Sequence, residues 1–285
     1  MASSLVRSVH NATNVLHSLI YFAPEAEQQF TGVGLKSGQM GYFAGRAAPM
    51  GAVGSGVVTA TFYNFNPRLV AQAIPEAWEL VSPEVVIGAR FAAADGALTR
   101  LLGPDVIASD DMITLAALVR DAAGACTPEG RPLYAGHADL DWPDAPHLVM
   151  WHALTLLREH RGDGHIAALN EAGLSGIEAL VTHCATGDGF LDEFARTSRG
   201  WSQEEWDATV SGLAARGLFN GEGRLTEAGQ ALRDQVEDAT DRMAAAPWEY
   251  LGEQRTEEVV RIGKAMTRTV LKAGAIPRAG VFQAP

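Results

Sequence analysis

The sequence has few of the residues that build covalent or metal-bound frameworks. Among its 285 residues there are two cysteines, Cys126 and Cys184. Two isolated thiols suit a reducing cytosol better than a disulfide scaffold. Neither belongs to a C-x-x-C pair, which argues against a zinc site built on cysteine. The residues point to no particular cofactor.

Long apolar runs are also missing. No stretch approaches the roughly 20 apolar residues that a membrane-spanning helix needs. The N-terminal 22 residues have an apolar period, but polar side chains interrupt it, including His10, Asn14 and His17. A signal peptide requires a continuous apolar segment, so we expect this stretch to be the first helix of a cytoplasmic protein with no membrane partner.

Positive charge is scarce as well. The formal net charge is −12. An acidic protein repels the phosphate backbone at long range, so nucleic acid is an unfavourable partner unless a basic patch overcomes the repulsion.

Familiar catalytic loops are absent. The glycine-rich stretch 51–56 reads GAVGSG, which is not the phosphate-binding pattern G-x-x-x-x-G-K-[ST], and no G-x-S-x-G elbow occurs. The sequence therefore leaves open whether the protein is an enzyme.

What is present predicts a packed, mainly α-helical protein. Hydrophobic residues make up 47% and charged residues 20% of the chain, as in ordinary globular proteins. The β-branched and aromatic block 57–67 predicts a short strand, and Asn66 followed by Pro67 predicts a helix start. Apolar periods and capping residues predict helices over 5–22, 84–102, 109–123 and 176–185.

The segment 127–146 interrupts this helical pattern. It contains four prolines, which favour turns and loops. We therefore expect a linker over 127–146, an N-terminal half over 1–126 and a C-terminal half over 147–285.

The two halves resemble each other faintly. A helix ending in Gly34-Leu35 and a helix ending in Gly173-Leu174 each lead into another helix about 139 residues apart. An internal duplication explains this pattern. Two unrelated helix–glycine–helix passages explain it equally well.

The C-terminal half carries the clearest local pattern. Ser202 and Glu205 form a predicted capping box at the start of a helix, the loop Asn220–Gly223 predicts a hairpin tip, and Thr226 predicts the start of a long helix. From about 176 to 241 the sequence, including ARGL and LTEAG, resembles the MarR-type winged-helix family. This resemblance implies a winged-helix fold with a small β-wing and, by extension to the first half, two winged-helix-like halves.

The whole chain is also similar to members of an actinobacterial helix-turn-helix family. The motifs FAGRAAPMG, TFYNFNP, REHRGDGHIAAL and LTEAGQALR carry this likeness. It implies a fold and no particular activity.

The helix that would enter the DNA groove in such a fold has the wrong charge. The segment QEEWDATVSGLAA (203–215) contains three acidic residues and no basic one, whereas reading DNA there takes Arg, Lys, Asn or Gln. From 187 to 234 there are nine acidic and five basic residues, a balance of −4. We therefore expect a scaffold that has lost DNA binding.

The strongest cluster of reactive side chains is REHRGDGHIAAL. His160, Asp163 and His165 are the candidate catalytic residues, and Arg161 is a candidate anion clamp. The alternative is structural: an Arg-Gly-Asp-Gly turn between two helices that holds itself together. The spacing matches no common metal-binding motif, so no metal site is expected.

The N-terminal half supplies further candidate ligand contacts. Tyr42 and Arg46 lie four apart and share a helix face, and a buried Arg46 needs an anionic partner, either a ligand or an internal carboxylate. Phe62 and Asn64 add aromatic and amide groups that suit a pocket or a core.

These patterns predict a small-molecule-binding protein or enzyme on a winged-helix scaffold, with a pocket between the two halves. The alternative is a ligand-responsive transcriptional regulator of the MarR type. A homodimer is compatible with either reading.

Overall fold

The fold is built from helices of very different lengths. The computed structural model describes residues 3–187, 189–277 and 281–282. The first half of the chain contains α1 (Ser3–Ser18), η1 (Leu19–Tyr21), α2 (Pro24–Gly32), α3 (Gln39–Ala47), η2 (Ala48–Met50), α4 (Ser55–Phe62), α5 (Pro67–Ala73), α6 (Glu76–Leu80), α7 (Pro83–Leu102), α8 (Pro104–Ile107) and α9 (Asp110–Ala123). Then follow α10 (Pro132–Ala138), α11 (Pro146–Glu171), α12 (Gly176–Cys184), α13 (Asp192–Ser198), α14 (Gln203–Ala215), α15 (Glu227–Met243), α16 (Ala246–Leu251) and α17 (Glu253–Lys272).

Side-chain caps begin the helices where the sequence predicts them. Asn66 accepts a hydrogen bond from the Arg68 amide at 2.9 Å. Ser202 and Glu205 form the reciprocal capping box, and Thr226 accepts from the Gly229 amide. These bonds satisfy amides that a helix start leaves free, so local sequence sets these boundaries.

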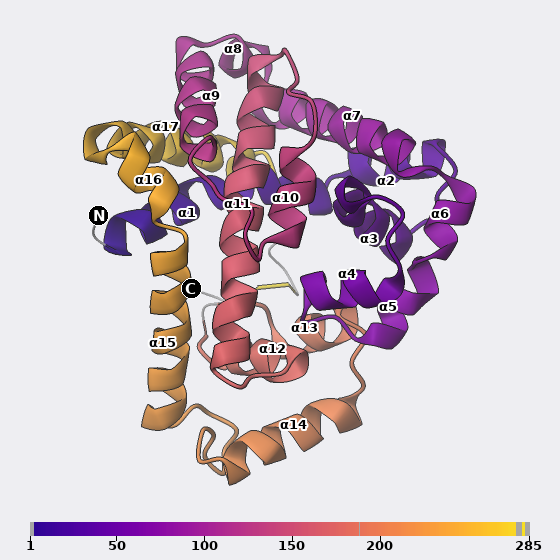
Figure 1. Cartoon of the computed structure of the whole chain (residues 1–285), viewed down its shortest axis with the longest axis vertical. Helices are drawn as coiled ribbons and strands as arrows, with labels where there is room; N and C mark the ends of the chain where they lie inside the picture. Colours follow the sequence, from indigo (N-terminus) through magenta and orange to yellow (C-terminus); the bar gives the residue numbers. More distant parts are fainter. Residues whose placement is uncertain (1–2, 188, 278–280, 283–285) are drawn as a thin grey trace.

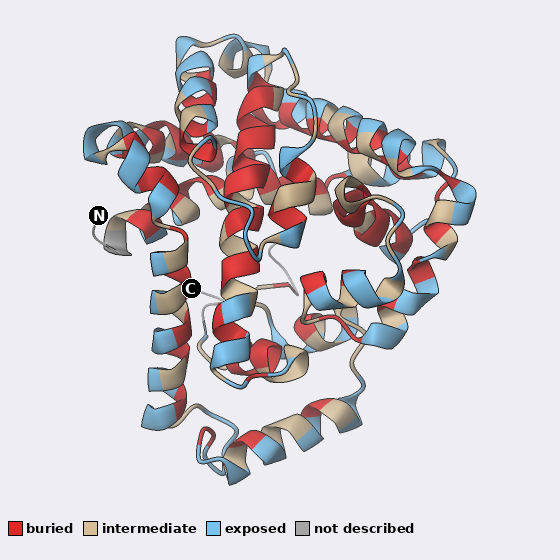
Figure 2. Cartoon of the chain, in the orientation of Figure 1, coloured by how far each residue is buried: buried red, intermediate tan, exposed pale blue. Residues whose placement is uncertain are grey.

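The apolar side chains gather in three clusters. The central cluster combines α1, the end of α7, α9, the first half of α11 and α17. A second cluster lies among α2–α7, and a third among the end of α11, α12–α15 and the loop before α15. Figure 1 shows α11 running through the middle of the molecule, and Figure 2 shows it buried along most of its length. The first part of α11 therefore belongs to the central cluster and its last part to the third cluster, so this helix connects the two.

The expected linker is partly helical. Residues 127–146 contain α10, which packs against α11 and η2. Leu133 and Tyr134 of α10 are buried in two different clusters. The central cluster contains residues that precede 127 and residues that follow 146. The two predicted halves therefore do not have separate hydrophobic cores.

Two predicted β-elements are wrong. The block 57–67 forms α4 and the start of α5, and Thr61 donates to the Val57 carbonyl at 3.0 Å as helical threonines do. Burial of Val58 and Phe62 against α3 and α5 outweighs their β-propensity. The predicted wing is reduced to one isolated bridge between Phe219 and Leu225, and the described ranges contain no extended strand.

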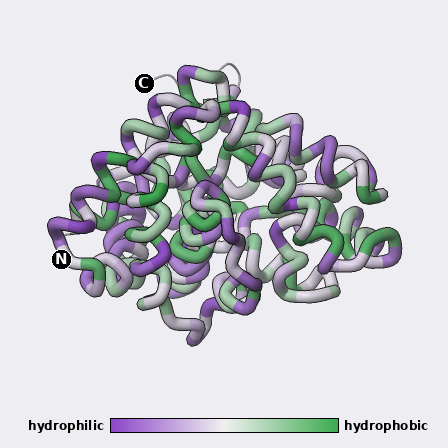
Figure 3. Tube along the Cα trace, turned by 90° about the horizontal axis from the view of Figure 1, so that it is seen from above, coloured by the Kyte–Doolittle hydropathy of each residue, from purple (hydrophilic) through white to green (hydrophobic). Residues whose placement is uncertain are grey.

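No helix in the described ranges is long and apolar enough to cross a membrane. Figure 3 shows hydrophilic and hydrophobic residues alternating along the helices.

Candidate functional site

A buried ion pair joins α3 to α11. The Arg46 guanidinium donates to both Glu159 carboxylate oxygens at 3.1 and 3.3 Å. It also donates to the Tyr42 hydroxyl at 3.0 Å and lies 4.3 Å from the centre of the Phe62 ring. The residues are 9% and 2% exposed for Arg46 and Glu159. Three of the predicted ligand contacts, Tyr42, Arg46 and Phe62, therefore lie together, and Tyr42 and Arg46 share one face of α3 as predicted.

Each member of the pair keeps the other charged. Burial alone lowers the pKa of Arg46, but Glu159, Tyr42 and Tyr21 together outweigh it and raise this pKa well above its usual value. Burial alone raises the pKa of Glu159, yet Arg46 and Arg158 hold it below its ordinary value. Removing either partner would leave an uncompensated buried charge.

More cations than carboxylates surround this pair. Arg158 donates to the same Glu159 carboxylate at 2.8 Å, and Arg90 and Arg199 lie close enough to interact electrostatically with Arg46. Among the described residues, Glu159 is the only carboxylate in an ion pair with any of these four arginines, and it pairs with Arg46 and Arg158. We call Arg46, Arg90, Arg158 and Arg199 the arginine cluster.

Arg90 is the most deeply buried member of the arginine cluster, at 2% exposed. Its guanidinium lies 4.5 Å from the centre of the Trp151 ring and 3.5 Å from His17 Nε2. Burial lowers the pKa of Arg90, and burial with Arg158 and Arg90 lowers the pKa of His17 well below its usual value. His17 is therefore neutral, and it neither repels the Arg90 guanidinium nor neutralises its charge.

Arg199 comes from the turn between α13 and α14. Its guanidinium lies 4.9 Å from the ring centre of Phe65 and 5.0 Å from that of Phe190. Its Nε lacks a hydrogen-bond partner among the described residues. Burial lowers the pKa of Arg199, which shows how poorly the surroundings compensate this charge. Burial also favours the neutral form of Tyr42, but Arg46 and Arg199 together lower the Tyr42 pKa.

A cavity of about 290 Å³ adjoins the arginine cluster, between η1, α2, α3 and α7. Aromatic side chains and two arginines share its walls. Gly41 and Gly45 let the Phe30 ring lie directly against α3, because a Cβ at Gly45 would stand 2.5 Å from Phe30 Cζ. The polar and aromatic lining residues are Tyr21, Phe22, Glu27, Phe30, Tyr42, Arg46 and Arg90, so one carboxylate shares the wall with the two arginines.

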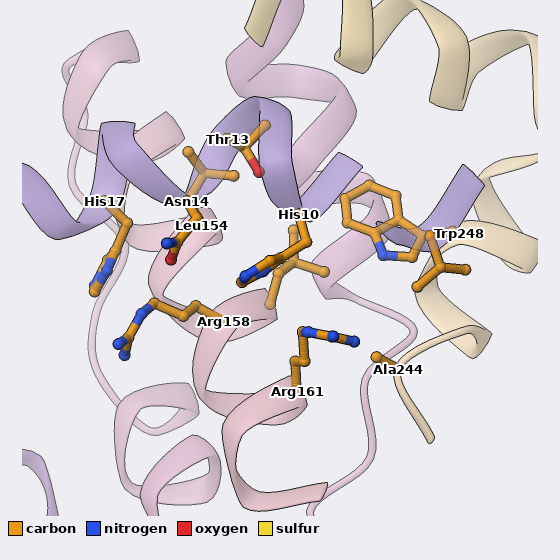
Figure 4. Close-up of a pocket in the computed structure, with 11 residues that line it drawn as sticks. His10, Thr13, Asn14, His17, Leu154, Arg158, Arg161, Ala244 and Trp248 are labelled. Carbon is orange, nitrogen blue, oxygen red and sulfur yellow. The ribbon is translucent and has the colours of Figure 1, made fainter. Parts of the chain in front are cut away.

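A second, much smaller cavity of about 30 Å³ lies between α1 and α11. Figure 4 shows Arg158 and Arg161 extending from α11 toward His10 and His17 of α1. This volume suits about one water molecule. The cavities share a wall, since His17 lines the small one and contacts Arg90 of the large one.

The residues of REHRGDGHIAAL do not form the turn that the structural alternative assumed. They lie within the continuous helix α11, which passes through Gly162 and Gly164 without a break. His160 and Asp163 therefore lie on one side of the helix and His165 on another.

His160 and Asp163 face α10. The Asp163 carboxylate accepts a hydrogen bond from the Tyr134 amide at 2.9 Å, and His160 packs edge-on against the Tyr134 ring. Burial raises the pKa of Asp163 to about 6 and lowers that of His160 to about 4. Asp163 thus satisfies an amide at the start of α10, which is a structural role.

Arg161 and His165 face α15. Arg161 donates to Asp241 at 2.7 Å and His165 Nδ1 lies 2.8 Å from Thr240 Oγ1. Arg46, Arg161 and His165 consequently do not converge on one cavity. Asn64 is also apart from Arg46, and its carbonyl accepts from the Trp201 indole at 2.9 Å.

Sequence reasoning missed Arg90, Glu159, Arg158 and Arg199. The signal that singled out Arg46, a charge inside an apolar helical stretch, also applies to Arg90 in VVIGARFAAA and to Glu159 in LTLLREH. Arg199 gives no such signal, because its surroundings in the sequence are polar.

Metal ligands do not gather here. The described residues contain no group of three His, Cys, Asp or Glu side chains that could hold a metal ion.

The exposed face of α14 is acidic. Glu204 and Asp207 are exposed, and the helix carries no basic residue. The nearest arginines are paired: Arg216 donates to Glu178 at 2.8 Å and Arg224 pairs with Glu222. Little free positive charge is left on this face for phosphates.

Comparison with curated proteins and with solved structures found no match. The sequence model of a helix-turn-helix family does match, over residues 6–277. The chain therefore belongs to a helix-turn-helix family.

Proposed function

We propose that this helix-turn-helix protein binds a small organic anion in the 290 Å³ cavity, with the anionic group against Arg46 and Arg90. The observation that carries the proposal is the imbalance of charge around the cavity. Arg46 and Arg90 line the cavity together with Glu27, and Arg158 and Arg199 lie nearby. Among the described residues, the one carboxylate in an ion pair with any of these four arginines is Glu159, which pairs with Arg46 and Arg158, in a protein whose net charge is −12.

The energetics favour an external anion. Taking a cation out of water costs several kcal/mol unless a partner compensates it. Arg90 contacts a neutral histidine, the Trp151 ring and the Tyr21 side chain, and Glu159 also stabilises its charge, yet burial still lowers its pKa. A bound carboxylate or phosphate would supply the missing charge and charge-assisted hydrogen bonds.

The other walls and the volume of the cavity indicate what the remainder of the ligand would be. Tyr21, Phe22 and Phe30 supply apolar and aromatic walls, and ligand pockets of about 300–1,000 Å³ typically combine such walls with a few polar groups. A cavity at the lower end of that range suits a small molecule with one apolar part and one anionic part.

Thermal unfolding tests the proposal with benzoate and inorganic phosphate as probes. A ligand of the folded state raises Tm as its concentration rises, and we expect benzoate to do so more strongly than phosphate. Arg90→Met should abolish the response while leaving the stability without ligand equal or higher, since it removes a poorly compensated charge. Arg100→Gln is the matched control on α7, because Arg100 is exposed and pairs with Glu25.

An equal response of Arg90→Met and the unaltered protein would overturn the proposal. If Arg90→Met instead lowers Tm in the absence of ligand and still responds to benzoate, Arg90 has a structural role alone.

A ligand-responsive DNA-binding regulator is the second candidate, because the chain belongs to a helix-turn-helix family. The acidic face of α14 opposes it. Fluorescence anisotropy with genomic fragments at low salt should detect no binding. Sub-micromolar, sequence-selective binding would favour the regulator.

A further inference from the structure

One helix-ending turn recurs at five glycines of the described chain, Gly34, Gly173, Gly200, Gly217 and Gly274, and two of these turns lie at equivalent places in the two halves. Gly34 and Gly173 have φ of 108° and 64°. The Leu35 amide donates to the Phe30 carbonyl at 3.1 Å, and the Leu174 amide donates to the Leu169 carbonyl at 3.0 Å. These bonds span five residues in both places and lie 139 residues apart, and both leucines are buried.

The helices that follow repeat in order. α3 and α12 are nine residues long, and their first residues lie 137 positions apart, as do those of α4 and α13. The left-handed turn residues Tyr63 (φ 52°) and Gly200 (φ 76°) keep the same separation. Tyr63 is the one non-glycine residue with positive φ in the described ranges, and it shares with Gly200 the sign of φ but not the hydrogen bond, since the Asn64 amide donates to the Phe62 carbonyl whereas the Trp201 amide donates to the Arg196 carbonyl. Side-chain caps follow at Asn66 and Ser202.

Beyond the loop before α15 the separation becomes 143 residues and then stays constant. Arg90 and Arg233 are both buried at this separation in α7 and α15. Pro104 and Pro247 begin the short helices α8 and α16, and α9 and α17 start 143 positions apart. One longer loop in the second half accounts for the change.

The first helix of each half divides its contacts in the same way. α1 packs against α17 and α2 against α7, while α11 packs against both α9 and α15. At a separation of 139, the straight α11 corresponds to α1, η1 and α2 together, which break at Ala23–Pro24. The N-terminal part of each half therefore packs on the last helix of the other half.

We infer that the chain is two diverged copies of one helix-turn-helix unit that exchange their terminal helices, so each copy is the partner that completes the other. The central cluster contains α1 and α9 from the first copy and α11 and α17 from the second. The contact between α1 and α17 is close: Thr267 donates to the Ala12 carbonyl at 2.7 Å. The surface that a separate subunit would cover is occupied within the chain, and the protein is a monomer.

Cleavage of the intact folded protein tests this interface. A protease site is inserted into the exposed loop 127–130, between α9 and α10. Analytical ultracentrifugation up to 100 µM should give a 30.2 kDa monomer before cleavage. After cleavage the two fragments should remain one particle of unchanged mass and separate only in denaturant. A dimer of the uncut chain, or separation into two folded fragments without denaturant, would overturn the inference.

A matched pair of glycine variants sharpens the test. A Cβ at Gly263 would stand 2.9 Å from Thr13 Cγ2 and 3.3 Å from the Ala12 carbonyl, whereas at Gly212 of α14 nothing lies within 4 Å. In the cleaved protein, Gly263→Val should lower the urea concentration at which the fragments separate, and Gly212→Val should not. Equal effects would remove α1–α17 from the interface. If Gly263→Val fails to fold, the cleaved parent protein decides the question alone.

Discussion

The regions α2–α7 and α11–α15 carry the same order of helices, and each buries an arginine of its last helix, Arg90 or Arg233, but Arg90 lies beside a cavity whereas Arg233 pairs with Glu237. In the first region Arg46 and Arg90 are buried beside a cavity. In the second region the acidic residues of α14 face solvent and its neighbouring arginines are paired on the surface. The position of Arg46 corresponds, 137 residues on, to His183 in α12. One backbone plan thus accommodates a buried arginine beside a cavity or one paired with a carboxylate, and the arrangement beside the cavity suits a ligand.

The largest expected effect separates the buried carboxylate from an exposed one. Glu159→Gln leaves the arginine cluster without its paired carboxylate, and should lower the free energy of unfolding by about 3–5 kcal/mol. Glu222→Gln, in the loop before α15, is the comparison, because Glu222 pairs with Arg224 at 68% and 73% side-chain exposure and should cost about 1 kcal/mol or less. Urea unfolding measures both. Similar losses would show that the two regions do not differ in this respect.

The second effect concerns acid. Burial lowers the pKa of both His160 and His165 to about 4, so between about pH 6.5 and 4 the unfolded chain binds more protons than the folded one. Stability should therefore fall as pH falls through this window, by about 1.4 kcal/mol per pH unit for each such histidine. Asp163, whose pKa is raised to about 6, opposes part of this slope.

The double variant His160→Gln, His165→Gln should flatten that dependence, as measured by urea unfolding at several pH values. The residues 139 positions earlier, Tyr21 and Ala26, are not histidines, but burial also lowers the pKa of His10 and His17 in α1, so these two groups leave part of the acid sensitivity in the double variant. If the double variant has the same pH dependence of stability as the unaltered protein, that dependence comes from other histidines.

A smaller effect tests the packing that shapes the cavity. Gly45→Val should push Phe30 away from α3, cost about 1–3 kcal/mol as overpacking does, and reduce the thermal response to benzoate. Gly56→Ala in α4 has open space around it and should be neutral or stabilising by up to about 1 kcal/mol. A Gly45→Val protein with an intact benzoate response would place the ligand elsewhere.

The smallest effect compares the equivalent helix caps. Asn66→Ala should cost about 2 kcal/mol and Ser202→Ala about 1 kcal/mol or less, because Asn66 is 1% exposed whereas Ser202 is exposed to water. Chemical denaturation of the two variants gives the difference. The reverse order would mean that burial does not decide the value of the cap.

Local sequence was sufficient for the helical class and for many boundaries. Capping side chains at Asn66, Ser109, Ser202 and Thr226 lie next to the amides they satisfy, so their effect can be read along the chain. The acidic character of α14 and the need of Arg46 for a partner were equally local. The choice between helix and strand over 57–67 was not local, because it depends on what covers Val58 and Phe62.

Only the tertiary structure decided which side chains meet. Arg46 pairs with Glu159, 113 residues away, and Arg90 reaches His17 across 73 residues. His160, Asp163 and His165 are neighbours in sequence, yet one continuous helix turns the first two toward Tyr134 of α10 and His165 toward Thr240 of α15. Sequence determines the chemical need of a buried charge, whereas the packing of distant helices determines which group, or which ligand, can meet it.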